Sequence, residues 1–236
     1  MTLLFALQRC ILYPNQKICI VTPNKEQSSR FISKAREFMQ ESSNLMAEIK
    51  GGMNGIHTTS QNTRIDFSNG SKIFAVVYGE GALGVRSNIL IVDEFVRTEK
   101  EIIQRVFVPF LTDVRTPRYV DLTDEERAEI PIEPNKQLYL SSIRGADEWS
   151  YHYFEEYLDY MAHGDMRYTT VSLPYQFGLK NGFINRDIVE QQFKEGQENL
   201  DMLLAATIYC LCIVICKENP FNCLKLLKHI ILQRSL

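Results

Sequence analysis

A short apolar run that ends in two acids constrains this chain more than any other feature. Residues Ile89 to Val92 are four consecutive aliphatic residues, the length of a strand that is buried on both faces. Asp93 and Glu94 follow directly. Such strands belong to parallel α/β sheets, which bind ligands at the edge formed by the carboxyl ends of their strands. We therefore expect two carboxylates at a ligand-binding edge of an α/β sheet.

A buried strand followed by Asp-Glu has the pattern of a Walker B motif. In this interpretation Asp93 holds Mg²⁺, directly or through water, and Glu94 polarises the water that attacks the γ-phosphate of ATP. The alternative is a core strand followed by an ordinary acidic turn, because this combination also occurs by chance. The neighbouring segments favour the first interpretation.

Composition indicates an ordinary globular protein. The chain has 236 residues, 23% of them charged, and a formal net charge of −3, so a DNA-binding role needs a local basic patch. The first 19 residues carry no signal-peptide cleavage site, and a reducing, cytosolic compartment is expected. Cys10 and Cys19 lie in apolar runs and are expected to pack as small hydrophobes. Cys212 and Cys216 have no paired motif around them, so no metal site is expected.

The apolar pattern of the first third predicts a helix, a strand and a second helix. Residues 3–11 have helical spacing, and Tyr13-Pro14-Asn15 ends that helix. Residues 17–22 predict a buried strand. Asn24 is the expected N-cap of the next helix, with Gln27 in the capping-box position. This alternation is the repeating unit of a parallel α/β sheet.

A hairpin and a glycine-containing loop precede the central strand. Residues 64–67 and 72–77 predict strands around Asn69-Gly70, which favours a type I′ turn. Three glycines between residues 79 and 84 predict a mobile connector. They lack the Gly-Lys-Ser/Thr ending of a phosphate-binding loop, so that function is the less favoured one.

The second half predicts two more strands, at residues 138–142 and 168–172, and a last helix at 188–199. Between the strands, residues 149–160 form an aromatic helical stretch, for which core packing is favoured over base stacking. The character of the chain changes near Ala205. The apolar stretch at 202–216 is shorter than the roughly 20 residues that span a bilayer. A basic amphipathic end follows, and a segment of altered character is favoured over membrane binding.

Taken together, residues 2 to 204 resemble the ATPase domain of the large terminase subunit of tailed bacteriophages, the motor that packages DNA. The resemblance depends on the order and spacing of LLFALQRCILYPNQKICIVTPNKEQ, GVRSNILIVDEF with EKEII after it, LYLSS, and YTTVSLPYQFG with GFIN after it. It implies an α/β fold with a three-layer sheet, of the RecA-like, ASCE-type P-loop NTPase class.

The resemblance also implies roles for individual residues. Asp93 is similar to the Mg²⁺-binding aspartate of the family, and Glu94 resembles its catalytic base. Arg86 lies where the family often places an arginine that reaches the ATP of a neighbouring subunit; a simple loop arginine is the alternative. Ser141 and Ser142 match the coupling motif that senses the γ-phosphate, or else they end a strand and cap the next helix.

Two departures from the family pattern limit what can be expected of this chain. No Gly-Lys-Ser/Thr occurs in it, so the Walker A strand and loop are missing, and the strands on either side are expected to have unpaired edges. Residues 1–204 would be a partial ATPase domain, truncated at both ends. Residues 205–236 would be a divergent tail in place of the nuclease domain, through a frameshift or gene decay. Enzymatic activity is therefore uncertain, and we expect very weak ATP binding without turnover.

The resemblance implies Mg²⁺ as cofactor and ATP as substrate. The partners implied are double-stranded DNA, the small terminase subunit, the portal protein and further copies of the chain in a ring, with no membrane. The location implied is the cytoplasm of a bacterial host, at the procapsid portal during packaging. Two alternatives remain open: a fragment of a helicase-like P-loop ATPase, and a non-enzymatic prophage remnant.

Overall fold

The structure is a computed structural model of the full chain. It describes residues 2–59, 62–79, 85–113, 115, 123, 125, 133–141, 149–182, 185–196 and 210–217. The chain divides into two compact units. The first unit comprises Met1–Asp93 and Arg97–Asn135, and the second comprises Glu94–Val96 and Lys136–Leu236.

The first unit contains helices and strands in the predicted alternation. In chain order its elements are α1 (Thr2–Leu12), β1 (Lys17–Thr22), α2 (Lys25–Gln40), α3 (Ser43–Ala47), the 3-10 helix η1 (Gly52–Gly55), β2 (Ile56–Thr59), β3 (Asn62–Asp66), β4 (Lys72–Val77), β5 (Ile89–Asp93), α4 (Lys100–Ile102), the π-helix η4 (Ile103–Phe107) and the 3-10 helix η5 (Val108–Phe110). The predicted strands at 17–22 and 72–77 are confirmed residue for residue.

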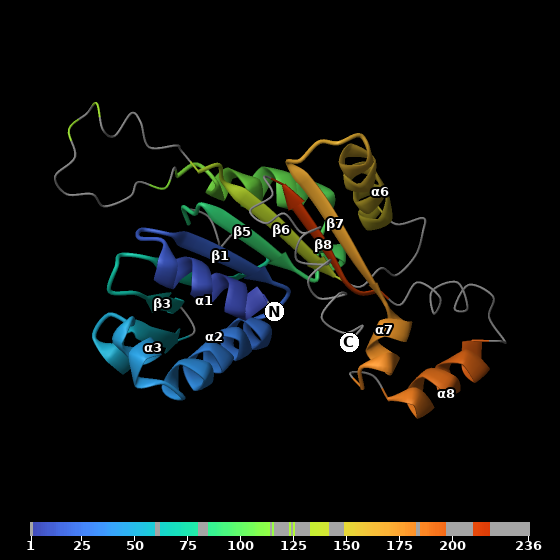
Figure 1. The fold of residues 1–236 in the computed structure, drawn as a ribbon, viewed down its shortest axis with the longest axis horizontal. Coiled ribbons are helices and arrows are strands. Elements are labelled where there is room, and N and C mark those ends of the chain that lie inside the picture. Colours follow the sequence, from blue (N-terminus) through green and yellow to red (C-terminus); the bar gives the residue numbers. More distant parts are fainter. Residues whose placement is uncertain are drawn as a thin grey trace, which may run out of the picture. The chain divides into compact units, whose positions relative to one another are not determined.

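The sheet of the first unit is parallel at its centre. β1 pairs in parallel with β4 on one side and with β5 on the other, and Figure 1 shows β1 beside β5. β3 pairs antiparallel with both β2 and β4. All four aliphatic residues from Ile89 to Val92 are buried. The predicted strand that is buried on both faces and ends in an acid is therefore confirmed.

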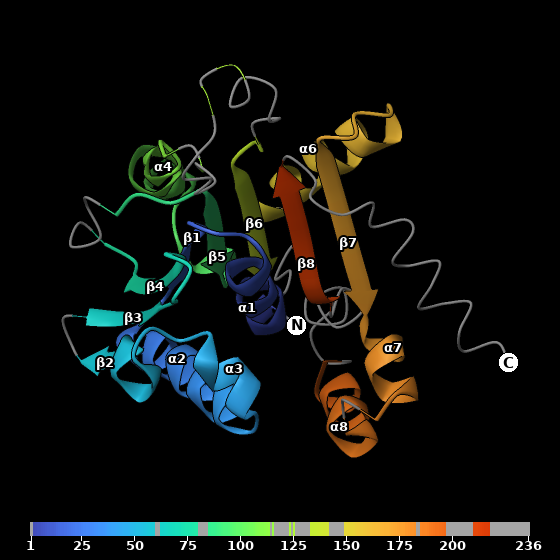
Figure 2. The same cartoon turned by 60° about the vertical axis from the view of Figure 1, so that its left-hand side comes forward.

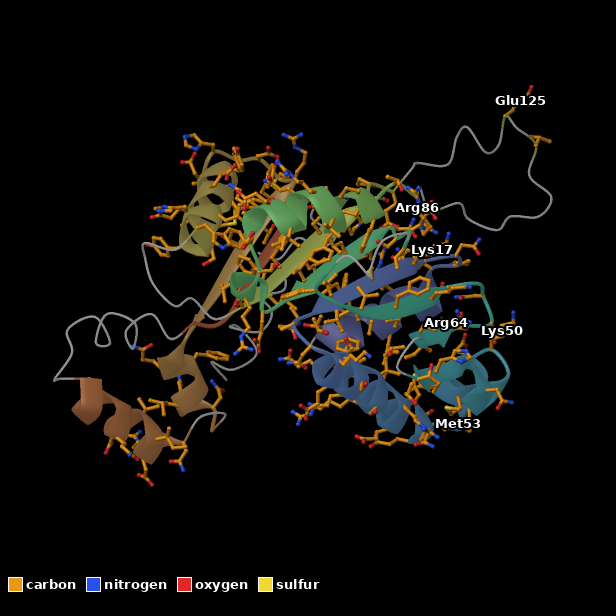
Figure 3. The ribbon with its side chains drawn as sticks, turned by 180° about the vertical axis from the view of Figure 1, so that it is seen from behind. Lys17, Lys50, Met53, Arg64, Arg86 and Glu125 are labelled. Atoms are coloured by element: carbon orange, nitrogen blue, oxygen red, sulfur yellow. The ribbon has the colours of Figure 1, made fainter. Side chains whose placement is uncertain are left out.

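Helices cover both faces of this sheet. Figures 1 and 3 show α1 and α2 on one face and the helical segment from α4 to η5 on the other. On the first face, α2 buries Ile32, Ala35 and Met39. On the second, the ring of Phe107 lies 5.8 Å from that of Tyr78, which follows β4. The first unit is therefore a three-layer α/β arrangement.

Local sequence signals account for the ends of α1 and α2. α1 ends at Leu12, directly before the predicted stop at Tyr13-Pro14-Asn15. Asn24 is the N-cap of α2, and its side-chain oxygen accepts a hydrogen bond of 2.9 Å from the backbone N–H of Gln27. The predicted cap is therefore confirmed.

The β3–β4 hairpin is confirmed, but the predicted type I′ turn is wrong. That turn needs positive φ at both central residues, and only Gly70 has it, with φ of 85°. Asn69 instead donates from Nδ2 to the carbonyl oxygens of Cys10 at 2.7 Å and Ile11 at 3.1 Å, while its Oδ1 accepts from the N–H of Ser71. These bonds hold the turn against the end of α1, which decides its conformation.

The second unit contains β6 (Lys136–Ser141), α6 (Trp149–Ala162), β7 (Tyr168–Pro174), α7 (Tyr175–Lys180), α8 (Arg186–Gly196) and β8 (Cys210–Lys217). A 3-10 helix, η3 (Phe95–Arg97), begins in this unit directly after Glu94. The predicted strands and the two predicted helices are confirmed over the residues that the structure describes; Ser142 and residues 197–199 of these predictions lie outside them. In the part of the chain that the structure describes, no helix has the length and apolar character needed to cross a membrane.

β8 lies in the tail, where the sequence analysis predicts no strand. It pairs antiparallel with β6, aligning Val214 with Leu140, and antiparallel with β7, aligning Val214 with Val171 (Figure 2). The expectation of unpaired edges is therefore wrong for β6 and β7, since β8 fills the position between them. The run CLCIVICK is rich in β-branched residues, which favour a strand over a helix.

The aromatic residues of α6 pack inside the second unit. Tyr157 is buried, and its ring lies 4.9 Å from that of Tyr168 in β7. The ring of Tyr153 lies 5.6 Å from that of the buried Tyr139 in β6. The packing interpretation of this helix is therefore confirmed for Tyr153 and Tyr157.

Candidate functional site

The carboxyl ends of β4, β1 and β5 meet at one edge of the first unit. Thr22, the last residue of β1, aligns with Val77 of β4, and Val21 aligns with Val92 of β5. Asp93 is the next and last residue of β5, so it lies at the same edge as Thr22. This is the edge at which parallel α/β sheets bind ligands.

Hydroxyl groups lie at the same edge and fix the strand ends. Oγ1 of Thr22 lies 2.6 Å from Oγ of Ser28 in α2, and it donates to the carbonyl oxygen of Asn24 at 3.0 Å. The phenol hydroxyl of Tyr78 donates to the backbone carbonyl oxygen of Asp93. The end of β5 is thus positioned through its backbone, and the side chain of Asp93 is half-buried.

Glu94 has an unusual backbone conformation. Its φ is 48°, and Asn15 is the one other non-glycine residue with positive φ among the residues that the structure describes. This left-handed conformation costs a non-glycine residue roughly 1–2 kcal/mol. Such strained residues concentrate at functional sites, where the surrounding structure holds them in place.

Phe95, the residue after this strained position, is fixed by aromatic packing. Its side chain is fully buried, and its ring packs edge-on against Tyr139 at 5.7 Å and against Trp149 at 5.6 Å. Glu94 is thus a turn residue between the end of β5 and the anchored Phe95. The adjacent carboxylates of Asp93 and Glu94 are therefore presented from a fixed turn.

The structure does not bring Arg86 close to Asp93. Arg86 is exposed, precedes β5, and donates from Nη1 to Oγ1 of Thr112. The five residues of β5 separate the amino and carboxyl edges by about 13 Å at 3.3 Å per residue. Arg86 and Asp93 therefore lie at opposite edges of the first unit.

Ser141 is the last residue of β6 in the second unit. It is buried, and its backbone aligns with Ile213 of β8. It thus occupies the strand-end position that the sequence predicts for it. Ser142 lies outside the described residues.

Asp93 and Glu94 are suitable groups for a magnesium ion shared with a nucleotide. Mg²⁺ prefers oxygen ligands, keeps several waters, and is usually bound by one or two carboxylates together with phosphates. Among the described residues, no group of three or more His, Cys, Asp or Glu side chains could hold a metal ion by itself.

The two buried cysteines of the first unit have a packing role. Burial raises the pKa of both the Cys10 and Cys19 thiols, so they remain protonated small hydrophobes, as predicted.

Sequence reasoning missed two features of this region. The bond from Tyr78 to Asp93 joins residues that are fifteen positions apart, and no local pattern indicates it. The strain at Glu94 was also not predicted, although a bulky buried residue directly after an acidic pair is a signal that could have been used.

No family model and no curated protein matches this sequence. Among solved structures, the large terminase of bacteriophage HK97 is similar to this chain, with a TM-score of 0.54 and 11% sequence identity, over 87% of this chain and 43% of the terminase. The chain has the fold of a bacteriophage large terminase. It spans less than half of that terminase's length. The predicted α/β, RecA-like fold class is thereby confirmed.

The ATPase domain of the Thermus phage P74-26 large terminase is also similar. The likeness covers 69% of this chain and 76% of that domain, with 11% identity and a TM-score of 0.38. At such identities the likeness to the HK97 terminase concerns the fold alone. The chemistry of the site therefore has to be argued from the residues of this chain.

Proposed function

We propose that this chain is part of the ATP-hydrolysing motor of a phage DNA-packaging terminase large subunit. One observation supports this function above the others. The pair Asp93 and Glu94 lies at the carboxyl edge of a parallel sheet, in a chain with the fold of a large terminase. Nucleotides bind at this edge in α/β folds of this kind.

In this proposal the two acids have different roles. Asp93 binds Mg²⁺, directly or through water, and the ion neutralises charge on the β- and γ-phosphates of ATP. Glu94 orients the attacking water and polarises it for attack on the γ-phosphate. Because Glu94 directly follows Asp93 in the chain, both carboxylates act on one nucleotide in this proposal.

Arg86 and Ser141 have supporting roles in the proposal. Since Arg86 is at the edge opposite Asp93, it acts on the nucleotide of a neighbouring copy and stabilises charge on the transferred phosphoryl group. Ser141, with Ser142 after it, senses the γ-phosphate from the end of β6 and links hydrolysis to movement.

The proposed partners follow from this function. They are double-stranded DNA, the small terminase subunit, the portal protein and further copies of the chain in a ring. The proposed location is the host cytoplasm, at the procapsid portal.

ATP binding and turnover of the full chain test this proposal. We expect weak binding of Mg²⁺ and ATP by calorimetry, because the sequence has no Gly-Lys-Ser/Thr to cradle the phosphates. Asp93→Asn should weaken that binding by at least about tenfold, through the lost carboxylate. Glu99→Gln is the matched control, since Glu99 is an exposed acid six residues further along. We expect no turnover above that of Glu94→Gln.

Each outcome distinguishes between the hypotheses. Binding that Asp93→Asn and Glu99→Gln leave equally unchanged would locate the nucleotide elsewhere. Clear turnover that disappears in Glu94→Gln would contradict the expected inactivity of the isolated chain, while supporting the assigned role of Glu94. The absence of measurable binding would favour a non-enzymatic remnant.

A further inference from the structure

A basic pocket lies at the edge of the first unit opposite Asp93. It is a depression of about 340 Å³ formed by the loop after α3, by β3 and by the start of β4. We define the basic pocket by six lining residues: Lys50, Arg64, Asp66, Phe67, Gly70 and Lys72. A volume of this order accommodates a phosphate group and the atoms next to it.

The charge of the basic pocket is positive although that of the chain is negative. Three cationic side chains, Lys50, Arg64 and Lys72, surround one carboxylate, Asp66, which leaves two positive charges. The Asp66 side chain is 12% exposed, whereas those of Arg64 and Lys72 are 34% and 41% exposed. The negative group is therefore at the base, and the positive groups face the solvent.

Asp66 holds two of these cations in position. Its Oδ2 accepts from Nε of Arg64 at 2.9 Å, and its Oδ1 lies 3.6 Å from Nζ of Lys72. Because this contact uses Nε, the terminal guanidinium nitrogens of Arg64 can donate to a ligand. Lys50 has no ion pair with any carboxylate of the described residues, so its ammonium group can contact an anion without breaking one.

The walls of the basic pocket are fixed by backbone contacts. The N–H of Lys50 donates to the carbonyl oxygen of Asp66 at 2.9 Å, and the N–H of Ser68 donates to the backbone carbonyl oxygen of Glu48 at 2.8 Å. The hydroxyl of Ser71 donates to the carbonyl oxygen of Tyr13 at 2.8 Å, which ties the adjacent turn to the segment after α1. The cations are thus held on a rigid frame, so binding an anion orders little additional chain.

Further cations continue the same edge of the first unit. Lys72 aligns with Lys17 at the start of β1, and Arg86 lies just before β5, the next strand. Figure 3 shows Lys50, Arg64, Lys17 and Arg86 along this edge. Lys17 is partly neutralised by Asp113 at 2.5 Å. Arg86 is exposed, but the proposed function assigns it to the nucleotide of a neighbouring copy, so it is not counted among the contacts. A polyanion is therefore a better match for the whole edge than a single small anion.

We propose that the basic pocket binds a phosphate of a nucleic-acid backbone, with Lys50, Arg64 and Lys72 as its cationic contacts. The choice of nucleic acid among polyanions rests on the proposed function. The contacts involve backbone phosphates only, so binding is independent of base sequence and decreases with salt. Since the basic pocket and Asp93 lie at opposite edges of the first unit, both sites can be occupied at once.

Fluorescence anisotropy of a labelled DNA duplex, without nucleotide, tests this site in the full chain. The variant with Lys50→Gln and Arg64→Gln should bind at least about tenfold more weakly at low salt. Its slope of log K against log salt should be smaller by about 2, one for each lost phosphate contact. Lys180→Gln removes an exposed lysine of α7 in the second unit, and it should leave affinity and slope unchanged.

Three outcomes would overturn the proposal: no duplex binding by the wild-type chain, equal binding by the double variant, or an equal loss in Lys180→Gln. Calorimetry with inorganic phosphate tests the other source of the same anion. If phosphate bound in a Lys50-dependent manner and the duplex did not, the basic pocket would be a small-anion site and the proposal would be wrong. Asp93→Asn should retain duplex binding, so failure of the nucleotide site is distinguishable from failure of the basic pocket.

Discussion

The two units build their sheets in opposite ways. In the first unit, β4, β1 and β5 are parallel, and helices connect or cover them on both faces. In the second unit, β6, β8 and β7 are antiparallel, and the middle strand comes from the tail. The order of strands in the second unit therefore does not follow their order along the chain.

The middle strand of each unit lies at a different place along the chain. β1, the middle strand of the first unit, precedes both of its parallel neighbours, and Ile18 aligns with Ile89, 71 residues further along. β8 follows both of its neighbours, and Leu138 aligns with Cys216, 78 residues further along. The loop-closure costs are therefore similar, because that cost grows slowly with loop length. Since β6 and β7 both pair with one late segment, the second unit should be the easier one to disrupt by shortening the chain.

Removing β8 should have the largest effect. A chain that ends at residue 204 lacks the strand that β6 and β7 pair with. At about 1 kcal/mol for each lost ladder hydrogen bond, we expect opening of β6 to become easier by more than about 3 kcal/mol, or at least 100-fold in amide protection. Hydrogen exchange measures this, and the amides of β1 should change by less than about threefold.

A chain that ends at residue 217 is the matched control, because it retains all of β8. It should keep the protection of β6 and β7. If both truncated chains protected β6 equally, β8 would not be the partner of β6. If β1 lost as much protection as β6, the two units would unfold as one.

The same contrast explains what could be predicted from the sequence. The strands KICIVT and ILIVD can be predicted from their local sequence alone, because each is a run of continuous apolar residues bounded by turn signals. CLCIVICK has the same character, but it follows an apolar stretch without turn signals and precedes a basic end. Its partners are known only once β6 and β7 are in place, and a local pattern does not contain that information.

For the candidate site, the sequence predicts the residue types and their order but not their surroundings. The acids at the end of β5 follow from the apolar run before them. The separation of Arg86 from Asp93 follows from strand length, and it could have been calculated. By contrast, the basic pocket joins a loop, a hairpin and a strand start, and only the fold brings Lys50 beside Asp66.

A pair of glycines, one in each unit, provides a second test of the comparison. Gly70 and Gly164 have φ of 85° and 84°. A Cβ on Gly70 would lie 2.4 Å from Oδ1 of Asn15, whereas one on Gly164 would meet nothing within 4 Å. Alanine at either position should lower the free energy of unfolding by about 1 kcal/mol because of the positive φ. Gly70→Ala should lower it by about 1 kcal/mol more, because of the clash with Asn15.

Urea unfolding of both variants measures that difference. Adding Asn15→Gly should remove most of the extra cost of Gly70→Ala, because it removes the clashing amide and glycine tolerates the positive φ of residue 15. If Gly70→Ala and Gly164→Ala lowered the free energy of unfolding equally, the β3–β4 turn would be able to shift and relieve the clash with Asn15 without a measurable loss of stability.

The smallest effect is confined to alkaline solution and to the second unit. Burial raises the pKa of Tyr139, Tyr153 and Tyr157 above the ordinary value, and neighbouring tyrosines raise that of Tyr157 further. A raised pKa in the folded state means that the unfolded state loses its proton more readily. The stability from these tyrosines is therefore retained below about pH 10 and lost as the pH rises above it.

Tyr157→Phe should reduce this alkaline loss, because it removes one of the buried hydroxyls. At neutral pH it should cost only about 1 kcal/mol, the worth of the 2.8 Å hydrogen bond to the hydroxyl of Tyr153. Melting temperatures at neutral pH and above about pH 10 give both quantities, and Tyr151→Phe on the same helix is the control. If Tyr151→Phe protected against alkali as well as Tyr157→Phe did, general charge repulsion would be the cause. A specific effect at Tyr157 would show instead that the second unit, whose middle strand comes from the tail, also depends on keeping its aromatic core uncharged.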